Sequence, residues 1–190
     1  IFSLDEMIKI WDPSRISKSP AIFDPLKLRA INAAYIRALP AEEFRRLADP
    51  FIDSAVHCDI DRDLLCANLQ PRCEVLEDIP PQLDFFDAVL PIDAEMYRNK
   101  KQKTTPESAK EALTALLPVL EAQTDWTRDA IFEACKTLAE QMEKKNGWLL
   151  FPLGIALSGK ARTPGGGTDL AAMMGREETL KRVKDALGKL

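Results

Sequence analysis

Apolar residues recur at helical spacing along most of the chain, without a convincing strand alternation. In residues 23–39, Asp24 is a typical N-cap and Pro25 a typical first helical residue. The apolar positions that follow at helical spacing are Ile31, Ala34, Tyr35 and Ala38. Two further short helices are predicted at 41–49 and 59–69, and residues 80–89 form a short apolar element with Phe85 and Phe86 in the core.

The helical pattern is cleaner after residue 105. Thr105 caps and Pro106 begins a helix over 106–123, although Pro118 should kink or weaken its last turn. Its apolar stripe consists of Ala109, Ala112, Leu113, Leu116, Leu117 and Leu120. Thr127 caps a second helix, with a face of Ile131, Ala134, Cys135, Leu138 and Met142. A short connection predicts antiparallel packing of the two helices.

The last third of the chain alternates apolar and glycine-rich stretches. Residues 148–159 are almost wholly apolar, and their length favours a buried helix over a strand. A loop over 160–167 follows. Residues 168–175 and 176–188 read as two terminal helices, because Gly175 and Gly188 are typical residues just beyond a helix end.

These elements predict an all-α fold in two consecutive helical bundles. Residues 98–105 contain no apolar side chain and are the best linker candidate. The predicted units are therefore 1–97 and 106–190. No internal repeat of fixed period is visible, which disfavours a solenoid.

The composition predicts the compartment of the protein and argues against a membrane-spanning segment. The 190 residues are 46% apolar and 29% charged, as in ordinary soluble domains, and no run of about 18 apolar residues could span a bilayer. We therefore expect a cytoplasmic protein without a membrane partner. The chain begins at Ile1 rather than methionine, which indicates a fragment or a processed chain.

Charge is distributed unevenly along the chain. The net charge is −4, yet residues 144–190 hold nine Lys and Arg against four Asp and Glu. A basic end on an acidic body predicts that a polyanion would bind near the C-terminus. A solvated helix face explains the excess about as well.

The four cysteines and the single histidine do not form a recognisable ligand pattern. A zinc site from His57, Cys58, Cys66 and Cys73 is conceivable, but the spacings match no compact ligand pair. Reduced thiols, mostly buried as small apolar groups, are the favoured interpretation. No acid–base constellation is visible either, so we expect no catalytic residue and no cofactor in this chain.

The stretch GIALSGKA, residues 154–161, comes within one residue of a phosphate-binding loop. Ala161 occupies the position of the Ser or Thr that binds magnesium, and no strand precedes the stretch. Ile155, Ala156 and Leu157 are apolar, whereas loop amides that hold phosphate must be exposed. The nucleotide-site interpretation is therefore rejected.

Three longer stretches resemble one family. FSLDEMIKIWDPSRISKSPAIFDPLKL (2–28), FPLGIALSGKARTPGG (151–166) and LAAMMGREETLKRVKDAL (170–187) are similar, in order, to the C-terminal anticodon-binding portion of bacterial glutamyl-tRNA synthetases. RISKS at 15–19 also echoes the lysine loop of class I aminoacyl-tRNA synthetases. Because that loop belongs to an ATP-binding Rossmann domain that these residues lack, a catalytic role of Lys18 is rejected.

The resemblance implies a helical cage that binds the anticodon loop of tRNA(Glu). We expect a monomer that does not bind DNA. Proteins read RNA sequence mainly in single-stranded loops, whose bases can be stacked and hydrogen-bonded at their edges. The parent enzyme would use ATP and Mg²⁺ for aminoacylation, whereas this portion would catalyse nothing. The alternative from another class is a non-catalytic helical module that binds proteins.

The resemblance also assigns anticodon contacts. Thr163 and Pro164 correspond to the pair that approaches the middle base, although Thr-Pro-Gly-Gly is also ordinary turn chemistry. Arg72 corresponds to the arginine that senses the third base, or is otherwise a helix-end charge. Gly154 and Gly166 replace an Arg and a Leu that approach the first base in the family, so reading of that base is in doubt or passes to neighbours such as Lys160 and Arg162.

Basic residues near the C-terminus are the expected contacts to the tRNA backbone. They are Lys160, Arg162, Lys181, Arg182 and Lys184, with solvated surface charge as the alternative, and such contacts weaken as salt rises. Lys18 and Ser19 would touch the tRNA stem below the anticodon or fix the fold.

Overall fold

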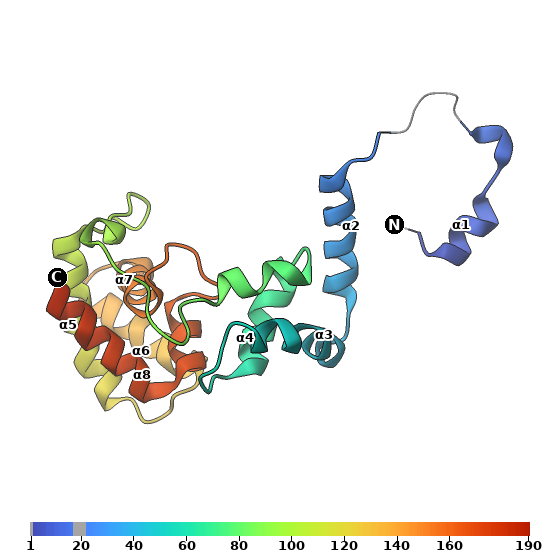
Figure 1. The fold of residues 1–190 in the computed structure, drawn as a ribbon. Helices are drawn as coiled ribbons and strands as arrows, with labels where there is room; N and C mark the ends of the chain where they lie inside the picture. Colours follow the sequence, from blue (N-terminus) through green and yellow to red (C-terminus); the bar gives the residue numbers. More distant parts are fainter. Residues whose placement is uncertain (1, 17–21) are drawn as a thin grey trace.

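The computed structural model describes residues 2–16 and 22–190, and these residues are organised as helices (Figure 1). The α-helices are α1 (Leu4–Ile10), α2 (Pro25–Ala38), α3 (Ala41–Asp53), α4 (Arg62–Leu69), α5 (Pro106–Ala122), α6 (Arg128–Gln141), α7 (Asn146–Ser158) and α8 (Gly167–Lys189). Short 3-10 helices are η1 (Pro13–Arg15), η2 (Gln70–Arg72), η3 (Leu76–Asp78), η4 (Pro80–Gln82) and η5 (Ala94–Tyr97). Within the described ranges, β pairing is limited to one isolated bridge, Asn99 with Thr104. The all-α prediction is confirmed.

The first helices form a small cluster at one end of the molecule, in which α3 packs on α4 and α2 packs on η2. Asp24 caps α2 as predicted, accepting hydrogen bonds from the amides of Leu26 and Lys27. The predicted apolar face of α2 is wrong, because Ala33 and Ile36 are its buried residues. Only the part of the helix near its C-terminus reaches the core.

In Figure 1, α1 stands apart from the other helices, and the described residues from Phe2 to the end of α2 carry an exposed apolar surface. Its exposed side chains are Phe2, Leu4, Met7, Ile8, Ile10, Trp11, Ile16, Ile22, Phe23, Leu26, Leu28, Ile31 and Tyr35. So many exposed large apolar side chains in one part of the chain indicate a contact surface.

Helices α5 to α8 form the larger bundle. Thr105 and Ser108 make a capping box at the start of α5, and Thr127 caps α6 by accepting from the amide of Ala130. Helix α7 is buried almost all round, as its apolar sequence predicts. The backbone leaves the helical conformation at Gly175, with φ of 77°, so the predicted division of α8 at this glycine is confirmed, whereas Gly188 lies inside the helix rather than beyond its end. No helix within 2–16 and 22–190 combines the length and hydropathy that crossing a membrane requires.

The two clusters share one core. The stacked rings of Phe85 and Phe86 are buried with residues of α5, α7 and α8, and the Asp61 amide donates to the Met173 carbonyl at 3.0 Å. Residues 98–105 form a closed turn in which buried Thr104 donates to the Tyr97 carbonyl at 2.7 Å. A division into units 1–97 and 106–190 stays a prediction.

Two glycines lie where α7 meets the start of α8, and only one of them limits the distance between the helices. A Cβ on Gly167 would lie 2.6 Å from the Leu150 carbonyl oxygen, whereas a Cβ on Gly154 would lie 3.8 Å from its nearest neighbour. We therefore expect Gly167→Ala to lower the free energy of unfolding by about 1–3 kcal/mol through overpacking. Gly154→Ala, the matched control, should stabilise α7 by up to about 1 kcal/mol. Urea unfolding measures both, and equal effects of the two substitutions would contradict the close contact at Gly167.

Candidate functional site

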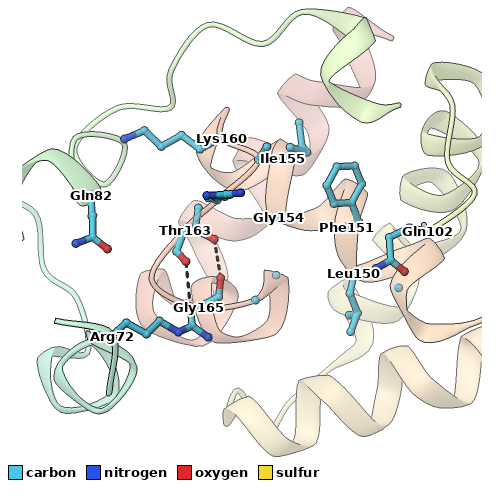
Figure 2. Close-up of a pocket in the computed structure, with 15 residues that line it drawn as sticks. Arg72, Gln82, Gln102, Leu150, Phe151, Gly154, Ile155, Lys160, Thr163 and Gly165 are labelled. Carbon is cyan, nitrogen blue, oxygen red and sulfur yellow. Dashed lines mark hydrogen bonds between the residues drawn. The ribbon is translucent and has the colours of Figure 1, made fainter. Parts of the chain in front are cut away.

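An open cavity of about 640 Å³ lies between η2, η4, the face of α7 and the loop that leads to α8 (Figure 2). Residues that the sequence singled out from both halves of the chain line it together. They are Arg72, Gly154, Lys160, Arg162, Thr163 and Gly166. No acidic side chain is among the described residues of the lining, so its charged groups are all cationic.

The loop over 160–166 is held by glycine geometry and by short hydrogen bonds. Gly159 ends α7 in the left-handed conformation, with φ of 68°, and a Cβ there would lie 2.6 Å from the Leu90 carbonyl oxygen. The Thr163 hydroxyl donates to the Gly165 carbonyl at 2.6 Å. The Gly166 amide donates to Asp169 Oδ2 at 2.7 Å and thereby caps α8. Residues 154–158 are helical, so the stretch is not a phosphate loop.

Arg72 spans the two halves of the chain. It is the last residue of η2, and its Nη1 donates to the carbonyl of Pro164 at 3.0 Å and to that of Thr163 at 3.4 Å. Its other guanidinium nitrogens have no acceptor among the described residues. The residues predicted to read the middle and third bases are therefore in direct contact, although 91 positions separate Arg72 from Thr163.

The two cations of this loop, Lys160 and Arg162, differ in whether they have a partner within the protein. Lys160 forms an ion pair with Asp84 and donates to the Pro81 carbonyl at 2.9 Å, with 23% of its side chain exposed. Arg162 is exposed, and no hydrogen bond or ion pair joins it to another described residue. Arg162 is thus the cation at this loop that is available to an anionic ligand.

The prediction that Arg182 contacts phosphate is wrong. Its side chain is 2% exposed, and its guanidinium donates to the carbonyls of Phe85, Phe86 and Leu157 at 2.6–2.7 Å. It also forms an ion pair with Glu178. The sequence shows a basic residue but not the helix kink and neighbouring loops that enclose it.

The other predicted backbone contacts lie away from the cavity or outside the described residues. Lys181 and Lys184 are exposed on α8, where they pair with Glu178 at 3.3 Å and Glu121 at 2.8 Å. Neither lines the cavity. Lys18 and Ser19 lie outside the described residues, so their predicted stem contact stays untested.

The sequence analysis assigned no site role to several residues that line the cavity, among them Gln82, Gln102, Leu150 and Phe151. Leu150 and Phe151 were read as core, because the whole of 148–159 is apolar. Their spacing with Gly147 and Gly154 puts them on one helix face, and two glycines on that face are the signal that could have indicated an open side.

The cysteines and His57 do not assemble a metal site in the described part of the chain. Burial raises the pKa of the Cys66 and Cys73 thiols to about 11, and that of Cys135 to about 12. The His57 ring contacts Asp87, which also accepts the amide hydrogens of His57 and Cys58. These contacts fix a loop, and hydrogen bonds from His57 hold the pKa of Asp87 well below its usual range.

Comparisons with known proteins give consistent findings. A family model described as an anticodon binding domain matches residues 28–187. Glutamate–tRNA ligases of Clostridium botulinum (strain Hall) and Clostridium tetani are 43% and 42% identical over 190 residues, which is all of this chain and 39% of each relative. A glutamate tRNA ligase structure from Elizabethkingia meningosepticum aligns with all of the chain at a TM-score of 0.83 and 26% identity, over 37% of its own length. The chain thus spans about two fifths of these relatives.

Proposed function

Because this chain belongs to the anticodon-binding domain family, we propose that it is the tRNA-binding part of a glutamate–tRNA ligase. It binds the anticodon loop of tRNA(Glu). The complete ligase activates glutamate with ATP and Mg²⁺ and esterifies the tRNA 3′ end. This part contributes affinity and identity, takes no cofactor of its own, and acts in the cytoplasm as a monomer that does not bind DNA.

The observation that carries the proposal is the cavity at which Arg72 meets the Thr163–Pro164 turn. An anticodon presents three unpaired bases, each with a flat apolar face and a polar edge. The cavity offers apolar side chains of α7, backbone groups of a fixed loop and only cationic charge. These are the features that a splayed RNA loop requires.

Each side of the cavity has a proposed role. Arg72 reads the third base with the guanidinium donors that Pro164 and Thr163 do not use. Thr163 contacts the middle base, whereas Pro164, predicted to share that role, is buried outside the cavity lining and accepts from Arg72 through its carbonyl. Gly154 and Gly166 leave room beside the first base, since neither carries a side chain into the cavity. Exposed Lys181 and Lys184 attract the RNA backbone from α8.

A protein-binding module is the second candidate, and the exposed apolar side chains within 2–16 and 22–35 are the observation that favours it. The two functions use different surfaces and can coexist in one ligase, whose remaining three fifths would cover that apolar surface. Binding of an RNA hairpin by the cavity tests the first of the two functions.

The decisive experiment measures fluorescence anisotropy of an RNA hairpin that carries the glutamate anticodon, titrated with the complete protein. We expect saturable binding that is stronger than for the same hairpin with a G at the third position. Binding that ignores every anticodon base, or that a DNA hairpin reproduces, would overturn the proposal.

Arg162→Glu should weaken binding of all hairpins alike. Arg162 is exposed and unpaired among the described residues, so a phosphate contact explains its presence at the cavity rim. Losing one such contact reduces the slope of log K against log salt by about 1. Lys110→Glu is the matched control, since Lys110 is exposed on α5 and does not line the cavity. Equal slopes for Arg162→Glu and the unaltered protein would remove Arg162 from the interface.

A further inference from the structure

The cavity has a second side that the contacts of Arg72 do not reach. Gln102 and Phe151 lie on that side in Figure 2, across the cavity from Arg72. Gln102 comes from the turn over 98–105, and Phe151 is half-buried on α7. Gln102 lies outside the three stretches that indicated the anticodon-binding family, whereas Phe151 is the first residue of one of them.

The backbone of Gln102 is fixed. Asn99 and Thr104 close its turn through paired amide–carbonyl hydrogen bonds of 3.0 and 3.1 Å. Inside the turn, the Asn99 side-chain oxygen accepts from the amides of Lys101 and Gln102 at 3.0 and 3.1 Å. A side chain anchored in this way can present a polar group at a constant position, which recognition of a ligand requires.

The carboxamide of Gln102 is positioned but unpartnered. It lies against Gly147, where a Cβ would come within 1.8 Å of Gln102 Oε1, so a side chain at 147 would displace the carboxamide. The side chain is half-buried at the cavity wall, and its carboxamide makes no hydrogen bond to another described residue. Gln82 in the same cavity differs, because its amide donates to the Asp78 carbonyl at 2.7 Å.

We propose that Gln102 and Phe151 form a nucleobase subsite, in which an unpaired RNA base lies on the Phe151 ring and Gln102 hydrogen-bonds its edge. This inference rests on the proposed function and names the residue that determines specificity at one anticodon position. Gly154, on the same face of α7, has no side chain that could take that role.

The chemistry of the subsite fits a base better than a peptide. Leu150, Phe151 and Ile155 supply an apolar floor, and aromatic rings stack on any base. A carboxamide both donates and accepts, so it can pair with neighbouring donor and acceptor atoms of a base edge. Arg162 at the rim matches the phosphates that accompany the base.

The test uses the complete protein and RNA hairpins in which each anticodon base is varied in turn. Gln102→Met keeps the side-chain length over Gly147 but removes the amide. We expect base preference to fall by about tenfold at one anticodon position and to persist at the third, where Arg72 acts. Gln141→Met is the matched control, because Gln141 is exposed on α6 and does not line the cavity, and it should leave every preference unchanged.

Two further variants separate recognition from folding. Gln102→Glu keeps the shape but only accepts, so the affected position should now favour bases with an exocyclic amino group over uracil. Phe151→Leu should weaken all hairpins by about tenfold without changing any preference. Hairpin binding with unchanged preferences in Gln102→Met overturns this inference alone, whereas a protein that binds no hairpin overturns the proposed function with it.

Discussion

Replacing Arg182 with methionine is expected to lower the free energy of unfolding by about 3–5 kcal/mol, the usual cost of breaking a buried charged group from its partners. Methionine fills much of the volume but leaves the carbonyls of Phe85, Phe86 and Leu157 without a donor. A buried acceptor that loses its partner costs free energy even when the packing survives. Urea unfolding followed by circular dichroism measures the loss.

The neighbouring Lys181 is the matched control for Arg182. Both side chains pair with Glu178, but 68% of the Lys181 side chain is exposed. Because exposed ion pairs contribute about 0–1 kcal/mol, Lys181→Met should hardly change the free energy of unfolding. If Arg182→Met were as stable as Lys181→Met and bound RNA more weakly, the original assignment of Arg182 to a phosphate contact would stand instead.

Local signals along the chain predicted the helices well. Caps at Asp24, Thr105 and Thr127 lie where the structure has them, because capping depends only on residues within one turn. The buried stripe of α5 follows from its period alone. The face of α2 was wrong because burial depends on where the neighbouring elements lie, and η2 packs on a different side of α2, which buries Ala33 and Ile36.

The site was predictable in its residue types but not in its contacts. Family motifs pointed to the Thr163–Pro164 turn and to Arg72, and the structure brings them together through a long-range hydrogen bond. Periodicity could not show that Arg182 is enclosed, since the Phe85–Phe86 segment that covers it is far away in sequence. Gln102 carried no signal at all, because its position depends on the missing side chain of Gly147.

Replacing Arg72 with glutamine should abolish most of the preference for cytosine over guanine at the third anticodon position. A guanidinium donates to the acceptor edge of cytosine, whereas its donors meet the N1 and N2 donors of guanine badly. Good base-edge contacts contribute about 1–3 kcal/mol of discrimination, so the ratio of affinities should fall by roughly tenfold or more. Glutamine both donates and accepts, and therefore tolerates either base.

Arg72→Gln also removes the hydrogen bond from Arg72 to the Pro164 carbonyl, and this second effect must be separated from the loss of base reading. Losing this hydrogen bond loosens the loop and should weaken every hairpin, so the ratio of affinities for the two hairpins, rather than either affinity, is the measured quantity. Arg162→Gln is the control, because it removes a cavity guanidinium that has no partner among the described residues. It should lower both affinities and keep their ratio.

Arg72→Lys keeps the charge without the planar fork and should lose the preference for cytosine too. An unchanged ratio in Arg72→Gln would mean that Arg72 serves only to hold the loop at Pro164, and that the third base is read elsewhere in the cavity.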